Sequence, residues 1–139
     1  SGLRAMSDLK KVLVVYRQDA VSTDIKKQFD RAGWYVHLAH NGLDGLMAAR
    51  RESFGLIVCA IDLPVITGIE MVRAVRNFSF NMTTPAVFVD WVGESVYDEI
   101  LTKLNARVVA PDDLTIFSLL NAADNRSTAK VVTLNPQRS

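Results

Sequence analysis

Continuous apolar runs alternate with amphipathic stretches along most of the chain. Residues 11–16 form a β-branched run without polar alternation, which is typical of a strand covered on both faces of a parallel sheet. In the stretch that follows, Val21, Ile25 and Phe29 recur at helical spacing, and Gly33 stands where a helix would end. The pattern therefore predicts a buried central strand followed by an amphipathic helix.

The same unit of strand and helix recurs as far as residue 124. The pattern predicts strands over 11–16, 34–39, 56–60, 86–89 and 107–110, and helices over 21–32, 43–51, 69–75, 96–104 and 112–123. Pro111 ends the last strand, and Asp112 or Asp113 is expected to cap the last helix. Five strands that alternate with five helices predict an α/β fold, a doubly wound parallel sheet with right-handed crossovers and helices on both faces.

The composition fits a single domain with its own core. Of 139 residues, 49% are hydrophobic and 22% are charged, and no apolar run reaches the ~20 residues of a membrane span. Residues 1–10 lack the apolar core of a signal peptide and are interpreted as a tag remnant or extension. Residues 125–139 are interpreted as a linker or tail. We expect one domain over 11–124, in a reducing cytoplasm and without membrane contact.

The charge is balanced overall but unevenly distributed. The net charge is +1, yet residues 1–51 contain nine Lys and Arg against five Asp and Glu, whereas residues 94–124 contain two against six. The acidic region disfavours binding of a phosphate backbone, so no nucleic-acid partner is expected for this domain. The single cysteine, Cys59, lies in the third predicted strand and is expected to be a small buried hydrophobe without a redox role.

Five segments resemble, in this order, the receiver domains of bacterial response regulators: KVLVV at 11–15, AGWYV at 32–36, AHNGLDGL at 39–46, LPVITGIEMV at 63–72 and TPAVFV at 84–89. The resemblance covers about residues 11–124. It implies a flavodoxin-like sheet with the strand order 2-1-3-4-5 and a pocket at the carboxyl ends of the central strands. It also implies a role in two-component signal transduction.

The residues that would carry out the family's chemistry differ in this chain. Receiver domains keep a phosphoacceptor aspartate four residues before a loop proline, an acidic pair that binds Mg²⁺ after the first strand, and a hydroxyl and a lysine after the fourth and fifth strands. At the matching positions stand Ala60, Tyr16, Arg17, Asp90 and Ala110. Together these residues supply neither a nucleophile nor a Mg²⁺ site. The resemblance therefore implies a degenerate phosphorylation pocket, with the loop residues Pro64 and Gly68 retained.

The remaining carboxylates near this pocket allow several interpretations. Asp62 is interpreted as an exposed or capping carboxylate rather than a displaced phosphoacceptor. A metal site made of Asp19, Asp62 and Asp90 is disfavoured because Arg17 is close by. Two alternatives stay open for Arg17: it pairs with Asp90 or Asp62 across the pocket, or these side chains are exposed and never meet.

Several aromatic residues are candidates for contacts with a partner. Trp91 is expected either to plug the pocket, which is favoured because Ala60 and Ala110 both leave space, or to anchor a partner. Tyr97 and Arg107 lie in the region that receivers use for partner contacts, and Arg107 replaces the usual switch aromatic. The loop aromatics Phe78 and Phe80 are expected to bury themselves locally rather than to dock a partner.

These observations favour a phosphorylation-independent regulatory domain that acts through protein contacts. We expect the N-terminal module of a larger bacterial response regulator, with no enzymatic activity, no cofactor and no metal. The partner or output domain is not identified by the sequence, and a homodimer is one further option. The alternative function is sensing of a small ligand or anion in the vacated pocket, with Arg17 as the anchor. An independent flavodoxin-like enzyme is least favoured, because no catalytic set can be placed on one group of loops.

Overall fold

The computed structural model describes residues 10–90 and 98–124. Its five strands are β1 (Lys11–Val15), β2 (Tyr35–Ala39), β3 (Leu56–Cys59), β4 (Ala86–Phe88) and β5 (Ala106–Val108). Its helices are α2 (Ala20–Arg31), α3 (Gly42–Arg51), α4 (Gly68–Asn77), α5 (Asp98–Leu104) and α6 (Ile116–Asp124). All paired strands are parallel, and the sheet order is β2-β1-β3-β4-β5. The predicted fold class and strand order are confirmed.

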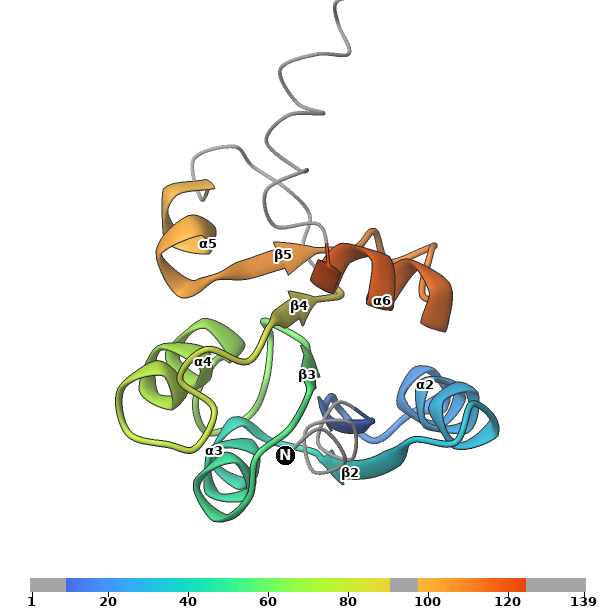
Figure 1. Ribbon diagram of the computed structural model, residues 1–139, viewed down its shortest axis with the longest axis horizontal. Coiled ribbons are helices and arrows are strands. Elements are labelled where there is room, and N and C mark those ends of the chain that lie inside the picture. The colour runs from blue at the N-terminus through green and yellow to red at the C-terminus, as the bar shows by residue number, and fades with distance from the viewer. Residues whose placement is uncertain (1–9, 91–97, 125–139) are drawn as a thin grey trace, which may run out of the picture.

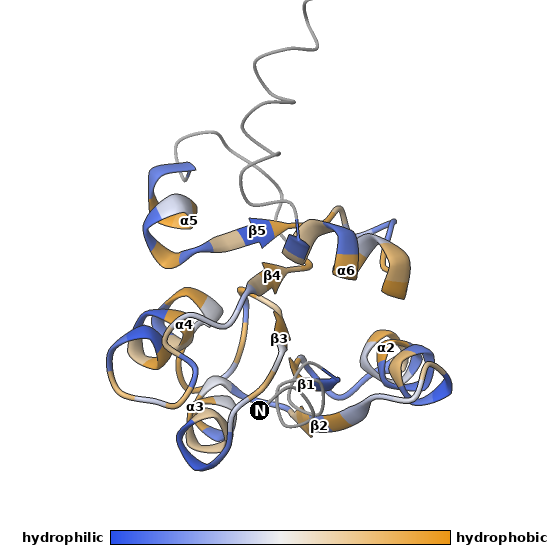
Figure 2. Ribbon diagram, in the orientation of Figure 1, coloured by the Kyte–Doolittle hydropathy of each residue, from blue (hydrophilic) through white to orange (hydrophobic). Residues whose placement is uncertain are grey.

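Helices cover both faces of the sheet. In Figure 1, α3, α4 and α5 lie on one side of the strands and α2 and α6 on the other. Residues 12–15 of β1 and all of β3 are fully or almost fully buried between these layers. Figure 2 shows hydrophobic residues on the central strands and hydrophilic ones on the outer turns of α2 and α3. Because the central strands are covered on both faces, their continuous apolar runs become the core, whereas the edge strand β2 is partly exposed.

Local capping sets where several helices begin. The Asp19 side chain accepts hydrogen bonds from the Val21 and Ser22 amides at the start of α2, and the Ser22 hydroxyl accepts in return from the Asp19 amide. Thr67 and Glu70 form the same reciprocal pair at the start of α4. Such reciprocal pairs, known as capping boxes, provide acceptors for backbone amides that have no partner within the helix. They fix the entry of α2 and α4 directly after the loops at the carboxyl edge of the sheet.

The last helix begins later than predicted. The prediction started it at residue 112 with Asp112 or Asp113 as its cap, but α6 starts at Ile116. The Thr115 hydroxyl accepts from the Ser118 amide at 3.1 Å and is the side chain that caps the first turn. The Asp113 carboxylate instead accepts from the Ser118 hydroxyl at 2.9 Å. The capping prediction is therefore wrong, although Asp113 lies beside the first turn.

A contact with another helix explains this start. The Gln28 side chain of α2 accepts a hydrogen bond from the Ile116 amide at 2.8 Å and donates one to the Leu114 carbonyl at 2.9 Å. Both groups lie at the chain's entry into α6, and the pair joins α2 to α6 on one side of the sheet. The cap of α6 is thus partly supplied from α2.

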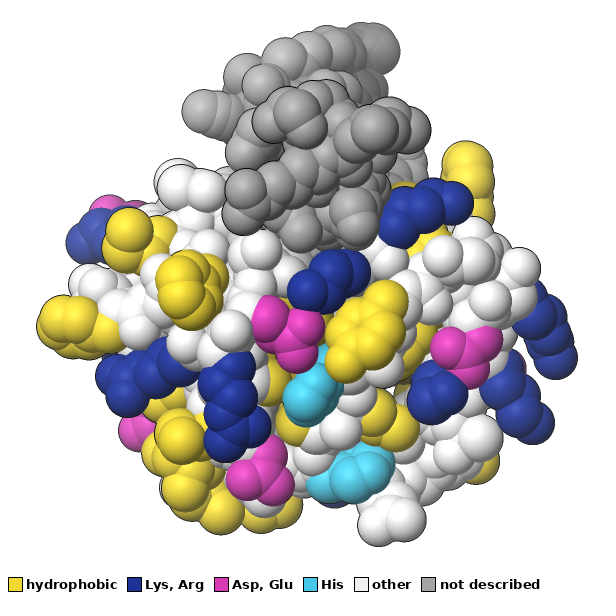
Figure 3. Space-filling model, turned by 60° about the horizontal axis from the view of Figure 1, so that its bottom comes forward, with side chains coloured by type: hydrophobic (Ala, Val, Ile, Leu, Met, Phe, Trp, Pro, Cys, Tyr) yellow, Lys and Arg dark blue, Asp and Glu magenta, His cyan; other side chains and the backbone are white. Residues whose placement is uncertain are grey.

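The loop between α4 and β4 also differs from its prediction. Phe78 and Phe80 do not bury themselves, because their side chains are 71% and 67% exposed. The buried residues of this loop are the polar Asn81 and Thr84, and the Asn81 side chain accepts from the Phe54 amide at 2.7 Å. Figure 3 shows several hydrophobic side chains that stand out on the surface, near Lys and Arg side chains.

The domain boundaries stay predictions, because residues 1–9 and 125–139 lie outside the part of the chain that the structure describes. Within the described part, none of the helices combines the length and the apolar character needed to cross a membrane.

Candidate functional site

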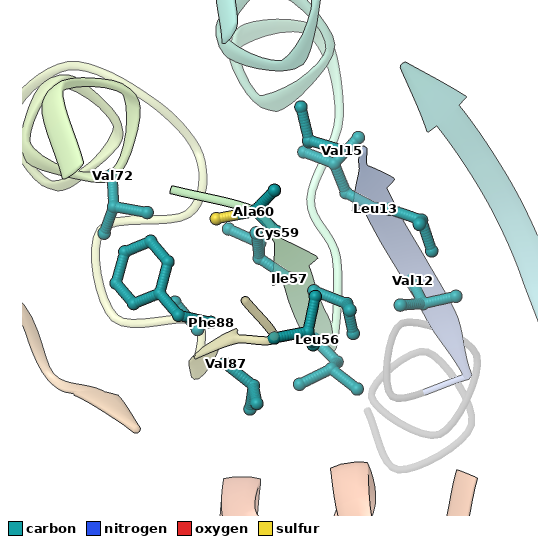
Figure 4. Packing of buried hydrophobic residues seen from close by; sticks show 14 of the residues in the cluster. Val12, Leu13, Val15, Leu56, Ile57, Cys59, Ala60, Val72, Val87 and Phe88 are labelled. Carbon is teal, nitrogen blue, oxygen red and sulfur yellow. The ribbon is translucent and has the colours of Figure 1, made fainter. Parts of the chain in front are cut away.

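The carboxyl ends of β1, β3 and β4 bring the predicted pocket residues to one edge of the sheet. Tyr16 follows β1 directly, Ala60 follows β3, and Asp90 lies two residues after β4. The Ala60 amide donates to the Val15 carbonyl at 3.0 Å, so the ladder extends to this point. Figure 4 shows Ala60 next to Cys59 and Val15 within the hydrophobic cluster. Ala60 is fully buried, and the loops around it define the candidate site.

Arg17 contacts Asp62 across this edge. Its guanidinium donates to the Asp62 carbonyl at 2.9 Å, lies 4.0 Å from the Asp62 carboxylate and stacks on the Tyr16 ring at 5.1 Å from the ring centroid. The Asp62 side chain is 94% exposed, so the ion pair itself contributes little. Of the two alternatives left open by the sequence, contact is the one observed. Its stronger component is the hydrogen bond to the backbone, which links the loop after β1 to the loop after β3.

Asp90 holds the backbone of the loop after β3. One carboxylate oxygen accepts from the Ile61 amide at 2.7 Å, and the other lies 3.3 Å from the Asp62 amide, which donates to it. Hydrogen bonds from backbone amides to a carboxylate are charge-assisted and stronger than those to a neutral acceptor. The negatively charged Asp90 carboxylate therefore lies at two adjacent backbone amides, those of the two residues that follow the buried Ala60.

The carboxylates of the alternative metal site have separate partners. Asp19 caps α2, Asp62 lies at the Arg17 guanidinium, and Asp90 accepts from backbone amides. Within residues 10–90 and 98–124, no group of three or more His, Cys, Asp or Glu could hold a metal ion. With Tyr16 and Arg17 after β1, the described residues do not fit the Mg²⁺ site that the resemblance implies.

The loop between β3 and α4 is packed tightly against its surroundings. The Gly68 amide donates to the Ile61 carbonyl at 2.8 Å, and a β-carbon at Gly68 would overlap the carbonyl oxygen of Ala60. Only glycine therefore fits at the start of α4. The retained Gly68 keeps this helix in direct contact with the end of β3.

Val65 in the same loop has a strained backbone. Its φ is 75°, a region that a β-branched residue rarely adopts, and the Ile66 amide donates to the Pro64 carbonyl at 3.0 Å across it. The Pro64 carbonyl also accepts from the Gly42 amide at 3.2 Å, so the loop is held on the first turn of α3. Strain of this kind persists only where the surroundings fix the backbone.

Burial suppresses ionisation of two groups near the pocket. It raises the pKa of the Tyr16 hydroxyl above its usual value, although the neighbouring Arg17 charge opposes this shift. Burial also raises the pKa of the Cys59 thiol well above its usual range, and the negative charge of Asp90 adds to the increase. Since a thiol reacts as its thiolate, Cys59 does not act as a nucleophile at neutral pH.

The other predicted site residues lie at or beyond the rim of this region. Ala110 is exposed after β5, and Arg107 lies within β5, where its guanidinium donates to the Ala106 carbonyl at 3.0 Å. Trp91 and Tyr97 fall outside the described residues, so their roles as plug, anchor or contact stay predictions.

The structure adds a groove that the sequence did not indicate. It has a volume of about 410 Å³ and lies between the edge strand β2 and α3, and its lining residues are His37, Leu38, Ala39, His40, Asp44, Met47 and Arg51. A ring nitrogen of His40 lies 3.0 Å from the Tyr16 carbonyl, which joins the groove to the candidate site. Both histidines appear on one face in Figure 3. A helix packed beside a sheet edge is visible only in three dimensions, so no sequence spacing could have indicated this groove.

Solved structures with a similar fold include receiver domains and response regulators. The chemotaxis response regulator CheY4 of Vibrio cholerae superposes with a TM-score of 0.72 at 24% identity, covering 84% of this chain and 97% of that one. A response regulator of Burkholderia pseudomallei, solved with a phosphorylated aspartic acid, a calcium ion and citrate, gives a TM-score of 0.78 at 18% identity and covers 94% of this chain and 75% of that one. The described part of the chain thus has the CheY-like fold.

Sequence comparisons agree with the fold. The transcriptional regulatory protein CusR of Escherichia coli is 33% identical over 72 residues, covering 52% of this chain and 32% of the relative. The response regulator ArlR of Staphylococcus saprophyticus is 26% identical over 92 residues, covering 66% of this chain and 40% of the relative. No protein-family model matches the chain. In fold, the described part of the chain is similar to receiver domains, and over part of its length its sequence is similar to response regulators. The matched segments span from 28% to 40% of the length of the first curated relatives.

Proposed function

We propose that this receiver domain regulates through protein contacts and does so without accepting a phosphoryl group. The observation that carries the proposal is the Asp90 carboxylate, which accepts from the amides of Ile61 and Asp62 beside the buried Ala60. A negative charge fixed at this point repels an incoming phosphoryl group. Ala60 has no oxygen to which such a group could be transferred.

The loops around the pocket support one fixed arrangement. Phosphoryl transfer depends on positioning the reactants and on neutralising charge by a metal or a cation. Here the Arg17 guanidinium donates to the Asp62 carbonyl, and the Asp90 carboxylate holds the amides of the same loop. Both contacts join neighbouring loops within the chain. These contacts between loops would keep the domain in a single conformational state. The domain would then have no enzymatic activity and no bound cofactor.

The partner of a domain held in one state would be an output domain or a separate protein. The curated relatives are named as transcriptional regulators and response regulators, and each is longer than the segment matched here. We therefore propose that the chain is the N-terminal module of a larger bacterial response regulator in the cytoplasm. The fixed state of the pocket would be read through contacts with that partner.

A labelling experiment tests this function. The protein is incubated with acetyl phosphate, with and without Mg²⁺, and its intact mass and amide NMR spectrum are recorded. The control is a receiver domain that has the phosphoacceptor aspartate, treated in parallel. The expected result is no phosphate adduct and no Mg²⁺-dependent change at residues 60–62. A Mg²⁺-dependent adduct would contradict the proposal.

Anion sensing in the same pocket is the second candidate. It is supported by Arg17, whose side chain is partly exposed at the mouth of the pocket and stacks on Tyr16. The Asp90 charge opposes it, which is why we favour the first proposal. Thermal unfolding with inorganic phosphate distinguishes them, because a ligand specific for the folded state raises the melting temperature. Binding at this site predicts a phosphate-dependent increase that is lost in Arg17→Ala; no increase in the unaltered protein argues against sensing of phosphate.

A further inference from the structure

A second surface lies at the edge of the sheet opposite to the pocket. The loop from 78 to 82 enters β4 at its amino end, whereas the pocket lies at the carboxyl ends of the strands. We call residues 78–82 the aromatic loop. Three of its apolar residues are exposed: Phe78 by 71%, Phe80 by 67% and Met82 by 53%. Exposed apolar side chains that gather in one place mark sites of interaction with another molecule.

The aromatic loop is held rigidly. Asn81 is fully buried, accepts from the Phe54 amide at 2.7 Å and donates to the carbonyls of Ala49 at 2.8 Å and Glu52 at 2.9 Å. The Arg76 guanidinium donates to the Asn81 carbonyl at 2.8 Å. The apolar side chains are therefore presented by a fixed backbone. A surface that is already ordered loses less conformational entropy on binding.

The helices that hold this loop add positive charge. Arg50 in the last turn of α3 and Arg73 in α4 are exposed. Glu52, the acidic residue next to the loop, has its carboxylate 2.8 Å from the Lys11 ammonium and is thus already paired. Aromatic residues and arginine together are typical of interface anchors, and this charge favours an acidic partner.

The chain itself carries an acidic and aromatic surface of this kind. Phe117 in the first turn of α6 is 76% exposed. Asp112, Asp113 and Asp124 are exposed before, beside and at the end of the helix, and α6 contains no Lys or Arg. In Figure 1, α6 lies across the sheet from α3 and α4, so the two surfaces face away from each other. One copy of the chain cannot bring them together.

The geometry points to head-to-tail association, in which the aromatic loop of one copy binds the first turn of α6 in the next copy. Phe78 and Phe80 would pack against Phe117, while Arg50 and Arg73 approach the aspartates around α6. A symmetric contact through either surface would place like charges together, which disfavours it. Contact between two different surfaces is heterologous and leaves one surface free at each end, so it extends into longer assemblies or closes into a ring. This inference goes beyond the proposed function.

Two complementary variants test the arrangement by sedimentation velocity. Phe78→Ser/Phe80→Ser removes the loop anchors, and Phe117→Ser removes the anchor on α6. Because all three side chains are exposed, both variants are expected to fold, which circular dichroism checks. Tyr35→Ser, at an exposed aromatic residue of the edge strand β2, is the matched control. The expected results are a sedimentation coefficient that rises with concentration for the unaltered protein and for Tyr35→Ser, but stays constant for each variant alone.

Mixing the two variants gives the decisive result. Each retains the surface that the other lacks, so an equimolar mixture should form a 1:1 dimer and nothing larger. Added salt should weaken that dimer, because the Arg and Asp side chains are exposed. A monomeric unaltered protein, association that survives in either variant, or a mixture that stays monomeric would overturn the inference. None of these outcomes affects the labelling experiment, so the two proposals fail separately.

Discussion

At the scale of single residues, the Asp90 carboxylate accounts for the state of the pocket. Its two oxygens accept from successive amides of the loop after β3, at 2.7 Å and 3.3 Å. The Arg17 guanidinium holds the carbonyl side of the same loop through Asp62. Two side chains, from the loops after β1 and β4 on either side of β3, thus hold one short backbone segment. We infer that these contacts stabilise the fold in addition to their proposed effect on phosphoryl chemistry.

Replacing Asp90 should show how much this contact stabilises the domain. Asp90→Ala leaves the Ile61 and Asp62 amides without their acceptor, so the free energy of unfolding should fall by about 1.5–3 kcal/mol. Asp90→Asn keeps an acceptor oxygen but not the charge, and should lose less. Urea unfolding monitored by circular dichroism measures both changes. Equal stability of Asp90→Ala and the unaltered protein would show that the carboxylate does not hold the loop.

Replacing Val65 is expected to raise stability, in contrast to replacing Asp90, because the backbone conformation of Val65 is unfavourable for a β-branched residue. At a φ of 75° glycine is unstrained, so Val65→Gly should raise the free energy of unfolding by roughly 0.5–1 kcal/mol after its own entropy cost is subtracted. Val65→Ala keeps a β-carbon and is the matched control, with a much smaller gain. Thermal and urea unfolding provide the measurement. A loss of stability in Val65→Gly would mean that the exposed Val65 side chain makes a contact worth more than the strain.

At the scale of the elements, α6 depends on α2. The Gln28 side chain accepts from the Ile116 amide and donates to the Leu114 carbonyl. It therefore satisfies a donor at the amino end of α6 that no residue within the helix can satisfy. Since Phe117 lies in this first turn, the same contact also positions the acidic surface proposed for association.

Removal of this contact should loosen α6 before the rest of the domain. Gln28→Ala should lower the free energy of unfolding by about 1–2 kcal/mol, through the lost cap and hydrogen bond. Hydrogen exchange should be faster at the amides of residues 116–119 and unchanged in β1. Gln18→Ala, at an exposed glutamine, is the control and should have little effect. Exchange that is equally slow in Gln28→Ala would contradict the assigned role of Gln28.

The elements also show what the sequence could and could not predict. The strands were predicted from local patterns: burial on both faces leaves continuous apolar runs in β1 and β3, and partial exposure leaves alternation in the edge strand β2. The start of α6 was not predicted, because its partner Gln28 is 88 positions away from Ile116. Phe80 was expected to be buried, but Asn81 makes the buried hydrogen bonds that hold the loop. Long-range hydrogen bonds of this kind leave no periodic trace in a sequence.

For the candidate site, the sequence predicted where residues lie but not which contacts they make. Resemblance to receiver domains placed Tyr16, Ala60 and Asp90 near one edge of the sheet, and strand order alone accounts for that placement. The partners of these residues could not be predicted. The sequence left Arg17 a choice between pairing with Asp90 or Asp62 and remaining unpaired, and only the loop geometry decides that Arg17 contacts Asp62.

At the scale of the whole molecule, the receiver fold is retained while its pocket has a different set of contacts. The strand order, the tight approach of Gly68 to Ala60 and the capped start of α4 are all present. The contacts within the pocket are made by Arg17 and Asp90 instead of a metal ligand set. The proposed loss of phosphoryl chemistry is therefore a property of several loops together, and restoring one residue should not reverse it.

The most direct test of this claim restores the missing nucleophile. Ala60→Asp is incubated with acetyl phosphate and Mg²⁺, and phosphate incorporation is followed by intact mass, beside a receiver domain with an intact site. Circular dichroism first checks that the variant folds, because Ala60 is fully buried. We predict a folded variant without a phosphate adduct, because Asp90 and Arg17 still occupy the pocket. Efficient Mg²⁺-dependent labelling of Ala60→Asp would contradict the account.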